Sequence, residues 1–194
     1  DARGLPLSCA AAFALLSCYY LVQPLSDTIA LHVGIENTPW ITVGNLILIA
    51  VCNPLYAALV KALPTETFIP VIYRILGGVL VAFGVGFFFA PDSQLISFGF
   101  AIYIGTFSLF LMSTFWARMA SLHTRDQSKR VYGVIAAGAQ SGQLLSSLVA
   151  AFLFSFLHES IVFISAALLE LCVFLLGRRA LVATAVAPAA APAA

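Results

Sequence analysis

Residues 115–142 read FWARMASLHTRDQSKRVYGVIAAGAQSG, and this stretch gives the clearest indication of the fold. One long apolar run ends at Phe115 and Trp116, and a basic, polar segment follows it. A second apolar run then opens with Gly138 and Gly142, at a spacing suited to tight packing. This alternation of apolar runs and basic segments is typical of proteins that cross a membrane several times. The stretch therefore predicts a polytopic membrane protein.

The composition of the whole chain agrees with a membrane location. Of its 194 residues, 62% are hydrophobic and 9% are charged, whereas a soluble domain contains about 25% charged residues. A helix needs roughly 20 mostly apolar residues to cross the hydrocarbon core. Backbone groups in lipid must be hydrogen-bonded within the chain, so runs of this length are helices. The spans are expected at about 5–26, 38–60, 68–90, 94–116, 131–157 and 160–177.

These spans predict an all-α fold class, with one six-helix transmembrane domain over residues 1–180. Residues 181–194 follow as an Ala/Pro-rich tail, which by composition should be extended and disordered. The chain begins at Asp1 and not at Met, as expected of a protein that has been processed or trimmed.

The distribution of basic residues predicts the orientation of the domain. The first, third and fifth loops contain no Lys or Arg, whereas the fourth loop, residues 117–130, contains a group of them. This inner basic loop comprises Arg118, Arg125, Lys129 and Arg130. Because basic segments stay on the inner side, both termini are expected on the cytoplasmic, stromal or matrix side. Binding of anionic lipid headgroups is the alternative role for this loop.

Several classes of function are not expected from this sequence. The four cysteines lie in or beside the spans and form no C-x-x-C pair, so we expect neither a disulfide nor a metal site. The chain contains no H-E-x-x-H, G-x-S-x-G or P-loop motif and no paired catalytic carboxylates, so an enzyme is not expected. Four basic residues on one loop are too few for a nucleic-acid partner.

Small residues recur every four positions along the fifth span. They are Gly138, Gly142, Ser146 and Ala150. Small side chains at this spacing allow another helix to approach closely. The sequence therefore predicts a helix-packing interface here, either within the chain or with another molecule.

Polar residues in the first and fifth spans indicate a solute path or a ligand-facing surface. In the first span, Pro24 interrupts the helical hydrogen bonds beside these groups, which predicts either a kink at a solute site or a helix end. In the fifth span, the polar stripe must face protein, water or a ligand because amides need partners within a membrane. The candidate residues are Ser17, Tyr20, Gln23 and Asp27 in the first span and Gln140 and Gln143 in the fifth.

Arg74 and Glu170 are the two charges expected within spans. Each lies about seven residues from the inner end of its span, so at 1.5 Å per residue both lie roughly 10 Å below the inner boundary. An unpaired charge at that depth is costly, which predicts an intramembrane ion pair between them. The pair is either a structural link or a site of proton or ion coupling.

Two further amides bear on cofactors. Asn45 and Asn53 in the second span complete the expected set of buried polar residues. Asn and Gln can ligate chlorophyll magnesium, and an aromatic content of 12% would suit pigment contacts. Chlorophyll, carotenoid and lipid are therefore the cofactors to consider if the chain belongs to a photosynthetic complex.

Several stretches together resemble one family. They are residues 19–27, Gly34-Ile35-Glu36-Asn37-Thr38-Pro39-Trp40, Asn53-Pro54-Leu55-Tyr56, residues 68–74 and the block 115–142, which is most distinctive at Phe115-Trp116 and Lys129-Arg130-Val131-Tyr132-Gly133. The chain resembles the N-terminal half of major-facilitator proteins related to the ADP/ATP carriers of plastids and intracellular bacteria. The resemblance implies six helices built as an inverted pair of three-helix repeats, with spans one and four lining a cavity and spans two and five facing a second half.

Departures from the family pattern separate two functional hypotheses. The family has Arg-Pro-Leu-(Lys/Arg)-Asp at the end of the first span, whereas this chain has Gln23-Pro24-Leu25-Ser26-Asp27, without the cations that phosphates would favour. One hypothesis is a degenerate half-transporter that serves as a structural or accessory subunit among other membrane subunits. The alternative is a solute or nucleotide exchanger that works as a dimer of halves or within a longer chain. An organelle inner membrane or thylakoid membrane is expected, with the bacterial inner membrane as the alternative.

Overall fold

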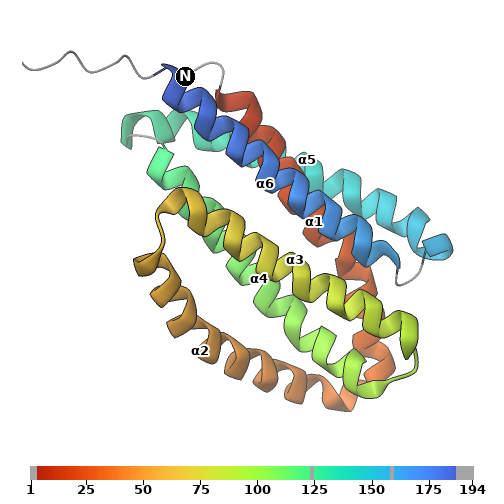
Figure 1. The fold of residues 1–194 in the computed structure, drawn as a ribbon. Coiled ribbons are helices and arrows are strands. Elements are labelled where there is room, and N and C mark those ends of the chain that lie inside the picture. Colours follow the sequence, from red (N-terminus) through yellow and green to blue (C-terminus); the bar gives the residue numbers. More distant parts are fainter. Residues whose placement is uncertain (1–3, 123–124, 158–159, 187–194) are drawn as a thin grey trace, which may run out of the picture.

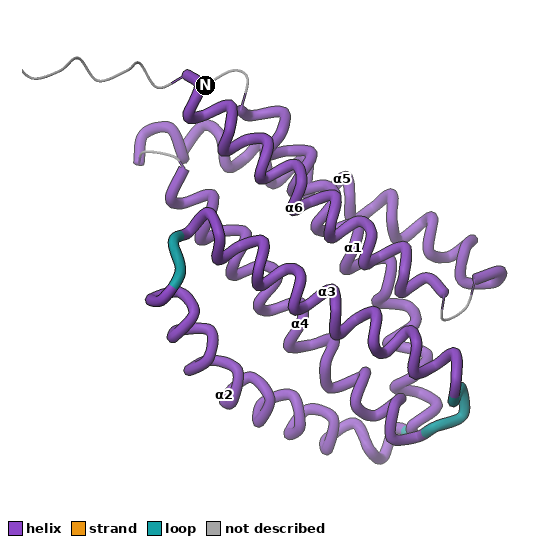
Figure 2. The backbone as a smooth tube through the Cα atoms, viewed as in Figure 1, coloured by secondary structure: helices purple, strands orange, loops and turns teal. Residues whose placement is uncertain are grey.

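The computed structural model describes residues 4–122, 125–157 and 160–186 of the chain. Within them lie the helices α1 (Gly4–Val33), α2 (Thr38–Ala62), α3 (Thr65–Phe89), α4 (Gln94–Leu122), α5 (Arg125–Leu157) and α6 (Ile161–Val186), and a 3₁₀ turn, η1 (Ile35–Asn37) (Figure 1). The described residues contain no strand (Figure 2). All six helices are long and apolar enough to cross a membrane. The all-α, six-span fold class is therefore confirmed.

Four of the helices form the core of the molecule. Helix α1 packs against α4 and α6, and α3 packs against the same two helices, so the four form a closed ring. Fully buried side chains from all four fill its interior, among them Leu15, Tyr73, Phe107 and Leu169. Helices α2 and α5 lie outside this ring, α2 on α4 and α5 on α1. Figure 1 shows α2 curving along the outer side of α4.

The packing repeats with an internal symmetry. Exchanging α1 with α4, α2 with α5 and α3 with α6 leaves the main set of packed helix pairs unchanged. Successive helices are separated by only a few residues of sequence and run antiparallel, so helices three positions apart cross the membrane in opposite directions. The described helices thus form two three-helix units of inverted topology, α1–α3 and α4–α6, which pack on each other most extensively through α1 with α5 and α6.

Hydroxyl and amide side chains link helices of one three-helix unit to helices of the other. Ser165 donates to the Cys18 carbonyl at 2.6 Å and links α6 to α1. Tyr103 donates to the Leu76 carbonyl at 2.6 Å and links α4 to α3. These donors satisfy hydrogen-bonding capacity that lipid could not satisfy.

The small residues of α5 pack within the chain. A Cβ placed on Gly138 would lie 3.2 Å from the Cys9 Cβ, and one on Gly142 would lie 3.0 Å from the Phe13 Cα. Ser146 and Ala150 are buried. Helix α1 therefore occupies this face, so of the two predicted alternatives the structure shows packing within the chain.

The connection between α1 and α2 is shorter than expected. Helix α1 continues beyond residue 26, the expected end of the first span, and reaches Val33 in spite of Pro24. The Thr28 hydroxyl donates to the Pro24 carbonyl at 2.8 Å. Gly34 then adopts a φ of 101°, a conformation that glycine tolerates best, and leads into η1. Pro24 is therefore an internal residue of α1 and does not mark its end.

The expected inner basic loop is mostly helical. Helix α4 continues to Leu122 and includes Arg118, whereas Arg125, Lys129 and Arg130 fall in the first turns of α5. The polar sequence between these two spans therefore extends both helices, because none of its residues breaks a helix. The tail also differs, because residues 181–186 belong to α6 and only 187–194 lie outside the described residues.

Replacement of Gly142 tests the close approach of α1 and α5. We expect Gly142→Ala to lower the melting temperature in detergent, because the added methyl would overlap the Phe13 backbone and overpacking costs about 1–3 kcal/mol. Gly133→Ala is the matched control in the same helix, since a Cβ there meets no atom within 4 Å. Equal melting temperatures for the two variants would contradict this packing.

Candidate functional site

A cavity of about 230 Å³ lies between α1, α4 and α5. Its polar side chains are Tyr20 from α1 and Gln140 and Gln143 from α5, and its walls include Phe115 and Trp116 from α4. Three of the six residues predicted to line a solute path thus lie around one cavity. The aromatic pair that ends the fourth expected span forms the opposite wall.

The other three predicted path residues occupy different environments. Gln23 and Asp27 follow Tyr20 by three and seven residues, which places them on the same side of α1. The Gln23 Oε1 atom is buried and has no hydrogen-bond partner in the described part of the chain, whereas Asp27 is exposed. Ser17 is buried and donates to the Gly142 carbonyl at 3.4 Å, so it contributes to packing and not to the cavity.

The two cavity glutamines do not share the same exposure. Gln140 is exposed and Gln143 is half-buried, and neither has a hydrogen-bond partner within residues 4–122, 125–157 and 160–186. Ser147, the next residue of the stripe, is also exposed. The stripe therefore reaches from the cavity to the outer surface of α5, where it can meet water or another polypeptide.

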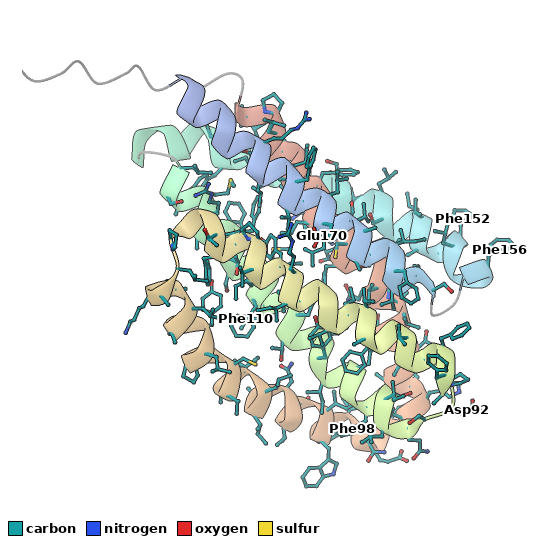
Figure 3. All side chains as sticks on the ribbon, viewed as in Figure 1. Asp92, Phe98, Phe110, Phe152, Phe156 and Glu170 are labelled. Carbon is teal, nitrogen blue, oxygen red and sulfur yellow. The ribbon has the colours of Figure 1, made fainter. Side chains whose placement is uncertain are left out.

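Arg74 and Glu170 lie side by side on α3 and α6. The Arg74 Nε and Glu170 Oε1 atoms are 3.6 Å apart. Their side chains are 65% and 55% exposed, so the pair lies on the outer surface of the bundle and not in its core. Figure 3 labels Glu170 on the side of α6 that is turned toward α3.

The basic residues of the fourth connection are divided between two helices. Arg118 is buried near the end of α4. Trp116 contacts the Tyr132 ring, with centroids 5.6 Å apart, and thereby joins the end of α4 to the beginning of α5. The side chains of Arg125, Lys129 and Arg130 lie outside the described residues.

The two asparagines of α2 differ in their contacts. Asn45 donates from Nδ2 to the Ile102 carbonyl at 2.8 Å and to the Thr106 hydroxyl at 3.0 Å. Asn53 is exposed on the surface of α2. Neither is buried, which corrects the expectation of a buried polar set, and Asn45 acts as the link that holds α2 to α4.

Sequence reasoning missed a second cavity, of about 490 Å³, at the ends of α1 and α3 and the beginning of α4. Its wall combines apolar side chains with His32, Asp92 and Ser97. Asp92 is labelled in Figure 3 at the turn between α3 and α4. These polar residues come from three separate segments, and only their common position at the ends of spans could have indicated the cavity.

Comparisons with known proteins returned no relatives, because no family model, no curated protein and no solved structure matches the chain. Among the described residues, no three His, Cys, Asp or Glu side chains are grouped closely enough to hold a metal ion. The site must therefore be interpreted from its own geometry.

Replacement of Asn45 tests how α2 is held. We expect Asn45→Ala to lower the free energy of unfolding in detergent by about 0.6–1.7 kcal/mol, which are the average and the maximum measured for hydrogen bonds between membrane helices. Asn53→Ala, in the same helix, removes an exposed amide and should change stability by less than about 0.5 kcal/mol. The assignment would fail if Asn53→Ala were the more destabilising change.

Proposed function

We propose that this chain is a structural or accessory subunit of a larger membrane complex, built on one six-helix half of a transporter fold of the major-facilitator type. In this proposal both termini lie on the cytoplasmic, stromal or matrix side. The membrane is that of an organelle, such as an inner or thylakoid membrane, or a bacterial inner membrane. In a photosynthetic complex, chlorophyll or carotenoid would be its cofactors.

The observation that carries this proposal is the open polar side of α1 and α5. Gln140 and Gln143 project there without a hydrogen-bond partner in the described part of the chain. An amide moved from water to an apolar medium without a partner costs roughly 2–7 kcal/mol. Lipid cannot supply a partner, so another polypeptide on this side is the simplest way to satisfy these groups.

The chemistry of the cavity favours a subunit over a nucleotide carrier. Its volume of about 230 Å³ is smaller than the roughly 300–1,000 Å³ of most ligand pockets. No Lys or Arg lines it among the described residues. Phosphate groups require cations or clustered donors, and residues 23 and 26, where the family carries cations, are Gln and Ser.

Transport is the second candidate function, and the inverted symmetry of the packing favours it. The cavity with Tyr20, Gln140 and Gln143 lies between α1 of the first three-helix unit and α4 and α5 of the second. Many secondary transporters have inverted repeats with a solute site at the repeat interface. A second half facing this cavity would complete a solute or nucleotide exchanger.

A native gel of mildly solubilised source membranes tests the subunit proposal. We expect the chain to migrate within a large assembly, identified by mass spectrometry and by absorbance of the band. A tagged Gln140→Leu/Gln143→Leu variant should show a smaller fraction in that assembly. Leu46→Ala/Leu55→Ala is the control, because both leucines are exposed on α2, away from the glutamines of α5. Migration of the wild-type chain as a small, colourless species would overturn the proposal.

Reconstitution into liposomes tests the transport alternative. On the subunit proposal, labelled nucleotides should exchange no faster in liposomes with the purified chain than in empty liposomes, because the cavity lacks cations for phosphate. Exchange that is saturable, and that Gln143→Leu abolishes while Leu144→Ala does not, would favour a carrier instead.

A further inference from the structure

The ion pair lies on the edge of the core that is opposite the cavity. In the ring of four helices, α1 and α4 form one edge and α3 and α6 form the other. Arg74 and Glu170 lie on the second edge, with more than half of each side chain exposed. The side chains around them on this surface are small or apolar, including Ile75 and Gly78 on α3 and Phe174 on α6. A pair of opposite charges is thus displayed on an otherwise apolar face.

Both charges lie at the same depth within the hydrocarbon region. Arg74 is seven residues from the beginning of the apolar segment Thr67–Phe89, and Glu170 is eight residues from the end of Ile161–Arg178. At 1.5 Å per residue this is roughly 10–12 Å from the inner end of each span. The 3.6 Å distance between Nε and Oε1 independently places them at one level. Charges at such a depth face protein or water in most membrane proteins.

The contact within the chain leaves most of the hydrogen-bonding capacity of the pair unused. A guanidinium has five N–H donors and a carboxylate about four acceptor positions. The two groups share one contact of 3.6 Å, which is longer than the roughly 2.7–2.9 Å of a charge-assisted hydrogen bond. Within the described residues, no other ion pair involves either group. The exposed remainder needs a partner that offers both an acceptor for Arg74 and a donor for Glu170.

We propose that the α3–α6 edge binds a second copy of this chain, related by a two-fold axis along the membrane normal. Such an axis keeps each residue at its own depth and reverses directions in the membrane plane. Arg74 of each copy then faces Glu170 of the other, and the two ion pairs join into a ring of four alternating charges. A second copy supplies both an acceptor for Arg74 and a donor for Glu170 at the correct depth, so no other partner is required.

The surface beside the pair is suited to close contact between helices. Gly78 and Ala82 follow Arg74 at intervals of four residues along α3, and both are exposed. A Cβ on Gly78 would meet no atom within 4 Å, so this position is open to a neighbour. Small residues at this spacing let membrane helices approach closely. An anionic lipid headgroup is the competing occupant, but it would satisfy Arg74 and repel Glu170.

Charge reversal in two differently tagged copies tests the dimer. Arg74→Glu alone or Glu170→Arg alone places four like charges at the interface, and self-association measured by co-purification in lipid nanodiscs should fall at least about tenfold. Co-expression of the Arg74→Glu copy with the Glu170→Arg copy should restore association, because two acidic residues then face two basic ones. Each single variant loses its intrachain ion pair whether it is expressed alone or with the other variant. Recovery of association on co-expression therefore reports only the contact between copies.

Two controls keep the outcome clear. Lys61→Glu reverses an exposed charge at the end of α2 and should leave association unchanged. The double variant R74E/E170R keeps an intrachain pair and should associate with itself but not with the wild-type chain, because like charges would then face each other. The proposal is overturned if the mixed single variants associate no better than either alone, or if the wild-type chain is a monomer enriched in anionic lipid. It goes beyond the proposed function and does not depend on it, because the native gel reports other subunits separately.

Discussion

Lipid cannot hydrogen-bond, and this constraint determines which helices of the bundle touch. Each buried polar side chain that links two helices donates to a neighbouring backbone carbonyl or shares a hydrogen bond with another side chain. Ser17 meets Gly142, Ser165 meets Cys18, and Tyr73 meets the Leu111 carbonyl at 3.2 Å. Because these donors are few and each has one partner, they fix the rotation of α1, α3 and α4 about their own axes. Apolar packing alone would leave those rotations weakly specified, since lipid tails are as apolar as leucine.

In each inverted unit, the outer helix packs against a core helix of the other unit through glycine. The two units nevertheless leave different surfaces exposed. Helix α5 approaches α1 through Gly138 and Gly142, and α2 approaches α4 at Gly44, beside Ile102. Both outer helices then turn large apolar side chains away from the core. Phe152 and Phe156, at the end of α5, stand clear of the bundle in Figure 3. The polar surfaces are the cavity edge beside α5 and the ion pair on α3 and α6. A protein that needed only lipid around it would have little use for either.

The sequence was sufficient for the number of spans and for the all-α fold class, because both follow from hydropathy and length. Helix ends were less predictable. Pro24 could stop a helix or lie inside one, and the Thr28 hydrogen bond that accompanies its inclusion depends on local geometry. The direction in which each polar side chain faces was the least predictable feature. Ser17 and Tyr20 were both assigned to a solute path, yet Tyr20 lines the cavity, whereas Ser17 packs directly on the Gly142 backbone of α5. The exposure of Arg74 and Glu170 depends on how α3 meets α6, which no local pattern encodes.

The central position of α1 has a consequence for biosynthesis. This helix is made before the other five, yet its three packing partners are α4, α5 and α6, and the polar contacts of Ser17 and Cys18 are with the last two. Leu157, the last residue of α5, is made 124 residues after Val33, the last residue of α1. At about 5–20 residues per second, that delay is on the order of 6–25 s. During it α1 carries unpaired hydroxyls and a thiol through the bilayer. The nascent chain therefore depends on the insertion machinery to hold its first helix until its last ones arrive.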